Sequence, residues 1–190
     1  MIIWNEFAAE IYQNAVDHGW WEEERSFGEI VALCHSELSE ALEEYRANRP
    51  LAYVLDYEGP AYVTDLKKFE GHKPEGIAVE LADCVIRILD WLGRYTADIP
   101  RLFDKALRLD LNQFESPTFG EMICGLHHLL SSAWGASRSS SLAFAEVKFA
   151  GVILVIMEWA EINSVNMEEI IRIKHAYNKG RPYRHGGKLL

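Results

Sequence analysis

The chain has 190 residues, of which 49% are hydrophobic, and its 29 acidic and 19 basic side chains give a net charge of −10. This length and apolar fraction suffice for one domain, or for a compact pair of half-domains, with a well-filled core. The acidic balance argues against general nucleic-acid binding, which needs a basic face. It leaves a phosphate ligand open, because bound cations can reverse the local field.

The cysteines and the apolar stretches indicate where the protein resides. Cys34, Cys84 and Cys124 lie far apart in apolar helical patterns without C-x-x-C spacing, which is typical of reduced core residues in a cytosolic protein. No signal peptide is recognisable, and the most apolar stretch, residues 152–159, is too short to span a bilayer. We therefore expect a cytoplasmic protein without a membrane partner.

Helix-start and helix-stop signals divide the chain into helices. Two capping boxes, Ser26-Phe-Gly-Glu29 and Thr118-Phe-Gly-Glu121, each open a helix, and Gly19 ends the first one. The expected helices cover about residues 4–18, 26–48, 74–93, 98–109, 118–134, 142–161 and 166–178. This pattern predicts an all-α fold, with a four-helix-bundle-like core and additional helices.

Three segments do not fit a helical pattern. Residues 49–73 contain Gly59-Pro60 between two short β-prone runs, which indicates a small β-hairpin insertion or a flap. Residues 135–141 are polar and rich in serine, so we expect a loop there. Residues 180–190 form a basic, glycine-rich tail that we expect to be non-helical.

Two repeated motifs indicate a degenerate internal duplication. Phe27-Gly28-Glu29 recurs as Phe119-Gly120-Glu121, an offset of 119 − 27 = 92 residues. Leu89-Asp90-Trp91 recurs as Met157-Glu158-Trp159, an offset of 157 − 89 = 68 residues. The alternative is that two capping boxes and two tryptophans coincide in a helical bundle.

Four acids carry the strongest functional signal. Glu37 and Glu40 in S-E-L-S-E-A-L, and Glu80 and Asp83 in V-E-L-A-D-C-V, are spaced i, i+3, so each pair lies on one helix face. Glu37 falls within the apolar stripe of its helix, and Glu80 is in line with Cys84. Two carboxylates ~4 Å apart repel by about 4 kcal/mol at an effective dielectric of 20. Carboxylates that face a core must be protonated, paired or bound to a cation, and oxygen ligands suit Mg²⁺.

Two other interpretations of the acids fit less well. Solvated helix faces with charge pairs suit Glu43, Glu44 and Arg46, but not Glu37 and Glu80, whose neighbours are apolar. A di-iron carboxylate bundle needs Glu-x-x-His on two helices, and none of the seven histidines follows a Glu at that spacing. We therefore predict Mg²⁺ as the cofactor, held by Glu37, Glu40, Glu80 and Asp83.

Three segments together form a recognisable set. They are H-S-E-L-S-E-A-L-E-E-Y-R at residues 35–46, K-P-E-G-I-A-V-E-L-A-D-C-V-I-R-I-L-D at 73–90, and the tail K-H-A-Y-N-K-G-R-P-Y-R-H-G-G-K at 174–188. This set resembles the MazG-like family of all-α nucleoside triphosphate pyrophosphohydrolases. The resemblance implies Mg²⁺-dependent cleavage of a nucleoside triphosphate between the α and β phosphates, giving the monophosphate and pyrophosphate. It also implies a homo-oligomer, in which helices of neighbouring subunits complete the pocket. The second half of this chain can serve that purpose within one chain, so a dimer of pseudo-dimers and a monomer are alternatives to the homodimer that we expect.

The basic tail offers candidate phosphate contacts. Lys174 and Asn178 are spaced i, i+4 on one face of the last helix, and Arg181 follows that helix. A basic cluster in so acidic a chain suits phosphate oxygens, although a solvated terminus is the alternative. With the resemblance, Lys174, Asn178 and Arg181 become predicted substrate contacts, and Arg184 and Lys188 weaker ones. Trp20 and Trp21 either stack on a base or anchor the core.

We expect a single domain over residues 1–190, with a catalytic half at about 1–110, a second helical half at about 117–178 and a basic tail at 179–190. The predicted activity is nucleoside triphosphate pyrophosphohydrolysis, with Glu37 or Glu40 as the general base for the attacking water. The alternatives are a narrower dUTPase-like or dCTPase-like enzyme, and a non-catalytic helical scaffold or nucleotide-binding module derived from such an enzyme. The expected partners are the substrate and a second copy, not nucleic acid.

Overall fold

The computed structural model describes residues 2–55, 62–96, 98–109, 111, 118–139, 141–187 and 189. The helices are α1 (Trp4–Asp17), α2 (Phe27–Arg46), α3 (Ile77–Tyr95), α4 (Ile99–Ala106), α5 (Phe119–Ser139), α6 (Leu142–Ile162), α7 (Met167–Lys179) and the short α8 (Arg184–Gly187). A 3₁₀ turn, η1 (Leu66–Lys68), follows the two short strands β1 (Val54–Leu55) and β2 (Tyr62–Val63). The predicted all-α class with a small hairpin insertion is confirmed.

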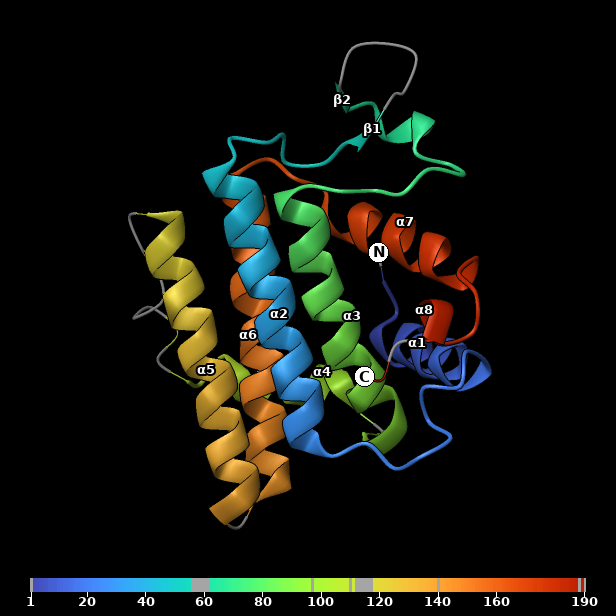
Figure 1. Cartoon of the computed structure of the whole chain (residues 1–190). Helices are drawn as coiled ribbons and strands as arrows, with labels where there is room; N and C mark the ends of the chain where they lie inside the picture. The colour runs from blue at the N-terminus through green and yellow to red at the C-terminus, as the bar shows by residue number, and fades with distance from the viewer. Residues whose placement is uncertain are drawn as a thin grey trace.

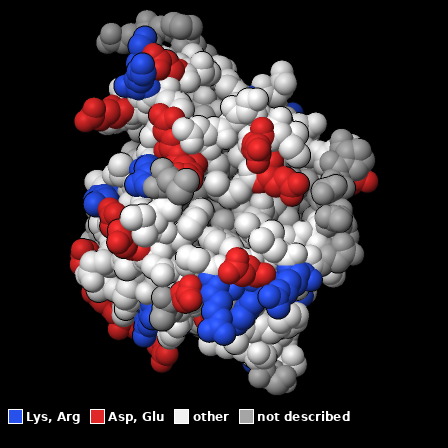
Figure 2. Space-filling model, turned by 180° about the vertical axis from the view of Figure 1, so that it is seen from behind, with Lys and Arg blue, Asp and Glu red and all other residues white. Residues whose placement is uncertain are grey.

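Four long helices form the core of the molecule. Helix α2 packs against α3 and α5, and α6 packs against α5 and α3, so the four lie side by side (Figure 1). Helices α1 and α7 cover the outer side of α3, while α4 packs on α6. Among the described residues, no helix is both long and apolar enough to cross a membrane. Seen from behind, acidic side chains are spread over the surface and basic ones gather in a clear group (Figure 2).

Local capping explains most of the helix starts. The Ser26 hydroxyl accepts a hydrogen bond from the Glu29 backbone N–H, and the Glu29 carboxylate accepts one from the Ser26 backbone N–H at 2.6 Å. Asn166 caps α7 in a related way, by accepting from the Glu169 N–H. Such caps satisfy backbone donors that have no partner within the helix. These starts agree with the sequence prediction because the capping groups are neighbours along the chain.

Helix α3 begins at Ile77, three residues after its first predicted residue, Pro74. The backbone of Glu75 instead forms a β-bridge with Tyr53, with N–O distances of 2.8 and 2.9 Å. Gly76 then has a φ of +112°, and a Cβ there would lie 2.7 Å from the Pro50 carbonyl oxygen. Only glycine tolerates this backbone and this close approach. The hairpin is confirmed through the register Val54↔Val63, while its predicted Gly59-Pro60 turn lies outside the described residues.

The predicted loop at residues 135–141 is wrong, since α5 continues to Ser139. The Ser137 hydroxyl donates to the Trp134 carbonyl at 2.7 Å, and the Ser139 hydroxyl donates to the Gly135 carbonyl at 3.0 Å. Serines that bond back to the preceding turn can remain within a helix. The predicted non-helical tail contains α8, a single turn in which Arg184 and His185 have positive φ values.

Equivalent contacts recur in two helix pairs, α2 with α3 and α5 with α6. Phe27 packs against Trp91 with ring centroids 5.1 Å apart, and Phe119 packs against Trp159 at 5.7 Å. Phe119 lies 92 residues after Phe27, and Trp159 lies 68 residues after Trp91, which are the offsets found in the sequence. His35 and His127, which are also 127 − 35 = 92 residues apart, contact each other across α2 and α5. Contact between equivalent residues is expected at a pseudo-two-fold axis, so these pairs favour the duplication over coincidence.

The His35–His127 pair predicts an acid-sensitive contact between the two halves. Their Nδ1 atoms lie 2.6 Å apart, which requires one ring to donate and the other to accept. Burial lowers the pKa of both imidazoles. Because the unfolded chain then binds more protons, this pair makes the free energy of unfolding fall as pH drops below about 6.5. Urea unfolding of His127→Asn between pH 7.5 and 5.5 should show a smaller fall than the wild type; an unchanged fall would contradict this.

Candidate metal centre

Three of the four predicted acids converge between α2 and α3. Carboxylate oxygens of Glu37, Glu40 and Glu80 lie within 4.8 Å of one another. Glu37 and Glu80 are buried, with 6% and 7% of their surface exposed, whereas Glu40 is exposed to solvent. The two acidic motifs therefore face each other, and Glu40 lies on the solvent side of the cluster.

The packing of α2 on α3 sets this geometry. The two helices pack along each other, and the Cys34 thiol reaches the Cys84 carbonyl oxygen at 4.0 Å. Gly76 fixes the start of α3 against the 50–51 backbone, which places Glu80 in the first turn of that helix. A carboxylate in a first turn is favoured by the positive end of the helix dipole. The dipole offsets only part of the cost of burying Glu80.

Asp83 lies beside the three glutamates and is bonded to α7. Its carboxylate accepts from the Lys174 ammonium at 2.8 Å and from the Asn178 amide at 3.3 Å. Lys174 is 4% exposed, and Asn178 is also buried. Two of the three predicted substrate contacts thus adjoin the acids, as their i, i+4 spacing suggests, and they reach the cluster through Asp83.

The other tail residues lie elsewhere. Arg181 lines a groove on the outer side of α7, and its carbonyl oxygen accepts from His18. Arg184 donates to the Gly19 carbonyl at 3.2 Å and pairs with Glu22 at 3.3 Å, so it fastens the tail to the end of α1. Lys188 is outside the described residues.

Burial dominates the electrostatics of the cluster. Desolvation raises the pKa of Glu80 to about 8, and the nearby Asp83 and Glu37 charges add to the rise, while the Lys174 charge opposes it. Desolvation and the Asp83 charge raise the pKa of Glu37 to about 7. Without a cation, the cluster therefore retains protons near neutral pH. A divalent ion would supply the charge that these carboxylates lack, and carboxylate oxygens are ligands that Mg²⁺ accepts.

The sequence analysis missed Arg87, which lies one helical turn after Asp83. Its Nε donates to one Glu37 carboxylate oxygen at 3.1 Å, and one Nη atom lies 3.1 Å from the same oxygen. This leaves the second Glu37 oxygen for another partner. An arginine within the apolar run of α3 was a detectable signal, because a buried guanidinium needs an acidic partner on a neighbouring helix.

A second buried charge pair extends this network. Asp90 accepts from the Trp21 indole N–H at 2.8 Å and lies 3.6 Å from the Arg25 guanidinium, which sits over the Trp20 and Trp21 rings. The two tryptophans thus hold a buried ion pair. A cavity of about 40 Å³ lies beside this pair, and its lining includes Arg87, Asp90, His175 and Asn178. Polar interior therefore continues from the acids toward Trp20. Trp4 packs edge-on against Phe103, with ring centroids 5.1 Å apart.

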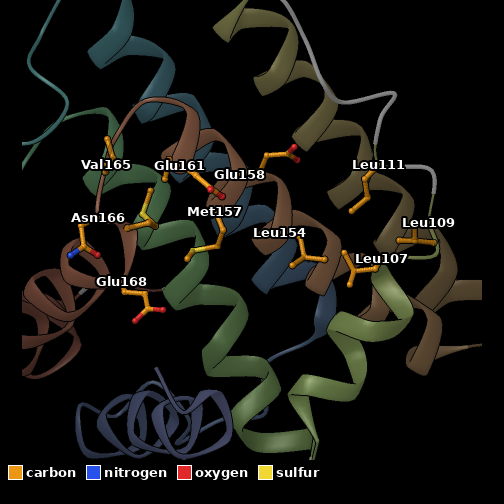
Figure 3. A pocket seen from close by; sticks show the side chains of 12 residues that line it. Leu107, Leu109, Leu111, Leu154, Met157, Glu158, Glu161, Val165, Asn166 and Glu168 are labelled. Carbon is orange, nitrogen blue, oxygen red and sulfur yellow. The ribbon is translucent and has the colours of Figure 1, made fainter. Parts of the chain in front are cut away.

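A larger cavity on the other half of the bundle has a different character. It has a volume of about 690 Å³, and Figure 3 shows aliphatic side chains from α6 and from the segment after α4 facing it, with glutamates nearby. Its lining is Leu107, Leu109, Leu111, Leu154, Met157, Glu158, Ala160, Glu161, Val165, Asn166, Met167 and Glu168. Because the described residues of this lining include no Lys or Arg, they offer no cation to a phosphate.

Comparison of the chain with protein-family models, with curated proteins and with solved structures found no match. The resemblance to MazG-like enzymes therefore stays a prediction that rests on the sequence motifs.

Replacing Glu80 by Gln should stabilise the metal-free protein at alkaline pH. Because the fold raises the pKa of Glu80, the contribution of this residue to the free energy of unfolding is complete below about pH 4.5. It is lost as pH rises to about 8 and the buried carboxyl ionises. The neutral amide removes this loss. In EDTA at pH 8, we expect Glu80→Gln to gain on the order of 2 kcal/mol in free energy of unfolding, with little gain at pH 4.5.

The matched control is Glu43→Gln, on the exposed face of α2. It should change the free energy of unfolding little at either pH. Equal free energies of unfolding of Glu80→Gln and the wild type from pH 4.5 to pH 8 would contradict the expected cost of burying the ionised Glu80 carboxylate.

Proposed function

We propose that the protein hydrolyses a nucleoside triphosphate between the α and β phosphates in a Mg²⁺-dependent reaction. The observation that carries this proposal is the convergence of the Glu37, Glu40 and Glu80 carboxylates within 4.8 Å. A buried ammonium, Lys174, lies next to them at Asp83. Acids that can hold a divalent cation, beside a cation that can meet phosphate oxygens, suit phosphoric anhydride chemistry.

The carboxylates take different roles in this proposal. Glu37 and Glu80 would hold the metal, with Asp83 beside them, and a bound ion would lower the pKa of a water and neutralise phosphate oxygens. Arg87 fixes Glu37 by occupying one of its oxygens. Glu40 is the exposed member of the cluster, and its carboxylate accepts from the Ser36 hydroxyl at 3.3 Å. It therefore acts as the base, because it can pass a proton on to solvent.

Lys174 is the residue of this chain best placed to stabilise the leaving pyrophosphate. Its buried position makes its charge more effective than a solvated one. The Asp83 and Glu80 charges raise its pKa, so it stays protonated at neutral pH. Asn178 orients Asp83 from the next turn of α7. A homodimer stays a prediction from the resemblance.

A panel of canonical and deoxynucleoside triphosphates tests the activity. With Mg²⁺, at least one of them should release pyrophosphate and the matching monophosphate, and EDTA should stop the release. Glu80→Gln should remove turnover while the protein stays folded, whereas Glu43→Gln should retain it. Mg²⁺ binding without pyrophosphate release from any triphosphate would instead favour the non-catalytic nucleotide-binding alternative.

Replacing Lys174 tests the charge that faces the phosphates. Lys174→Met should lower kcat by about 10²-fold, the usual effect of removing one such group. Lys179→Met, on the exposed side of the same helix, serves as the control because Lys179 pairs only with Glu10 among the described residues. Full activity of Lys174→Met would remove Lys174 from the proposed mechanism.

A further inference from the structure

Helix α7 separates the acids from a second cavity. Lys174 and Asn178 point toward Asp83 on α3. Ile173, Ala176 and Tyr177 lie on another face of α7 and line a groove of about 820 Å³. This volume lies within the range of small-molecule sites, about 300–1,000 Å³. We call it the α7 groove.

Two segments that carry basic residues form walls of the α7 groove. One wall is the turn after β2, with Lys67, Phe69 and His72; the other is the tail, with Arg181 and His185. Phe69 is buried at 2% exposure, so this wall is anchored in the fold. The ring of His185 packs on Trp20, with centroids 5.1 Å apart, and the Arg184 contacts hold the tail beside it.

The charge of the α7 groove is opposite to that of the chain. Among the described residues, its lining contains two full cations, Lys67 and Arg181, and one acid, Glu70, in a protein of net charge −10. Within the described residues, neither the Lys67 ammonium nor the Arg181 guanidinium forms a hydrogen bond or an ion pair. Both remain available to an anion, and a guanidinium can bind two phosphate oxygens at once.

The remaining lining suits a planar, partly apolar body. Tyr177 and Pro182, which are not fully buried, lie among aliphatic Leu66 and Ile173. Aromatic and proline surfaces of this kind accept a flat ring, and base–aromatic stacking tolerates different bases. An anion that also carries a planar heterocycle meets both the charge and the shape of the groove.

We propose that the α7 groove binds a nucleoside phosphate without a metal ion, at a site distinct from the acidic cluster. The two sites differ in what they require. The acidic cluster repels a triphosphate unless a divalent cation intervenes, because its carboxylates carry the same sign of charge. The α7 groove supplies its own cations, so its occupancy does not depend on Mg²⁺.

Titration calorimetry in EDTA tests this proposal, with a nucleoside 5′-monophosphate and inorganic phosphate as separate probes. The wild type should bind the nucleotide, and inorganic phosphate at least tenfold more weakly, since phosphate lacks the stacking ring. Lys67→Glu should weaken nucleotide binding at least tenfold. Lys68→Glu is the matched control, because Lys68 is exposed in the same turn but does not line the groove. It should leave the affinity nearly unchanged.

Two results would overturn the proposal. One is the absence of nucleotide binding by the wild type in EDTA. The other is an equal loss of affinity in Lys67→Glu and Lys68→Glu, which would indicate unspecific attraction. Thermal unfolding checks that both variants fold, and Lys67→Gln replaces Lys67→Glu if the reversed charge prevents folding.

Separate measurements distinguish a failure of the α7 groove proposal from a failure of the proposed activity. Pyrophosphate release with Mg²⁺ should persist in Lys67→Glu, because Lys67 is not part of the acidic cluster. A wild type that binds nucleotide in EDTA but releases no pyrophosphate with Mg²⁺ would reject the activity and keep the α7 groove. A wild type that releases pyrophosphate but binds nothing in EDTA would do the reverse.

Discussion

The burial of the Glu37 and Glu80 carboxylates is the constraint to which the rest of the site responds. Both side chains are buried, and burial raises the pKa of each to near or above neutrality. Two neighbouring cations offset part of the free-energy cost of this burial. Arg87 pairs with one oxygen of Glu37, and Lys174 pairs with Asp83. A fold that needed only stability would place apolar residues at these positions. The unfavourable burial of these carboxylates supports the proposed metal-dependent function, which requires concentrated negative charge.

The second helix pair, α5 and α6, shows how such helices pack without the four acids. In the register of the duplication, Glu37 corresponds to Leu129 and Asp83 to Gly151, and both of these residues are buried. The second pair keeps the Phe119–Trp159 contact that matches Phe27–Trp91. Packing has thus been retained in both halves, while the acids occur in one. The acids are therefore not needed to hold two such helices together.

Local features were predictable from the sequence, and features set by distant contacts were not. Ser26 and Glu29 cap α2 through neighbouring atoms, and the i, i+3 spacing of Glu37 and Glu40 fixes their shared face. The start of α3 depends instead on Gly76 lying against the 50–51 backbone, which no local pattern reveals. Arg181 followed Lys174 and Asn178 along the chain, but α7 ends before it, and the tail carries it into the α7 groove.

Direct measurement of a divalent ion at the acidic cluster tests the central claim. Electron paramagnetic resonance follows free Mn²⁺, a common stand-in for Mg²⁺, as protein is added. The account predicts a saturable site on the wild type that Mg²⁺ displaces and that Glu37→Gln and Glu80→Gln each lose, while Glu43→Gln retains it. Equal binding by the wild type and both cluster variants, or no saturable binding at all, would contradict a metal centre between α2 and α3.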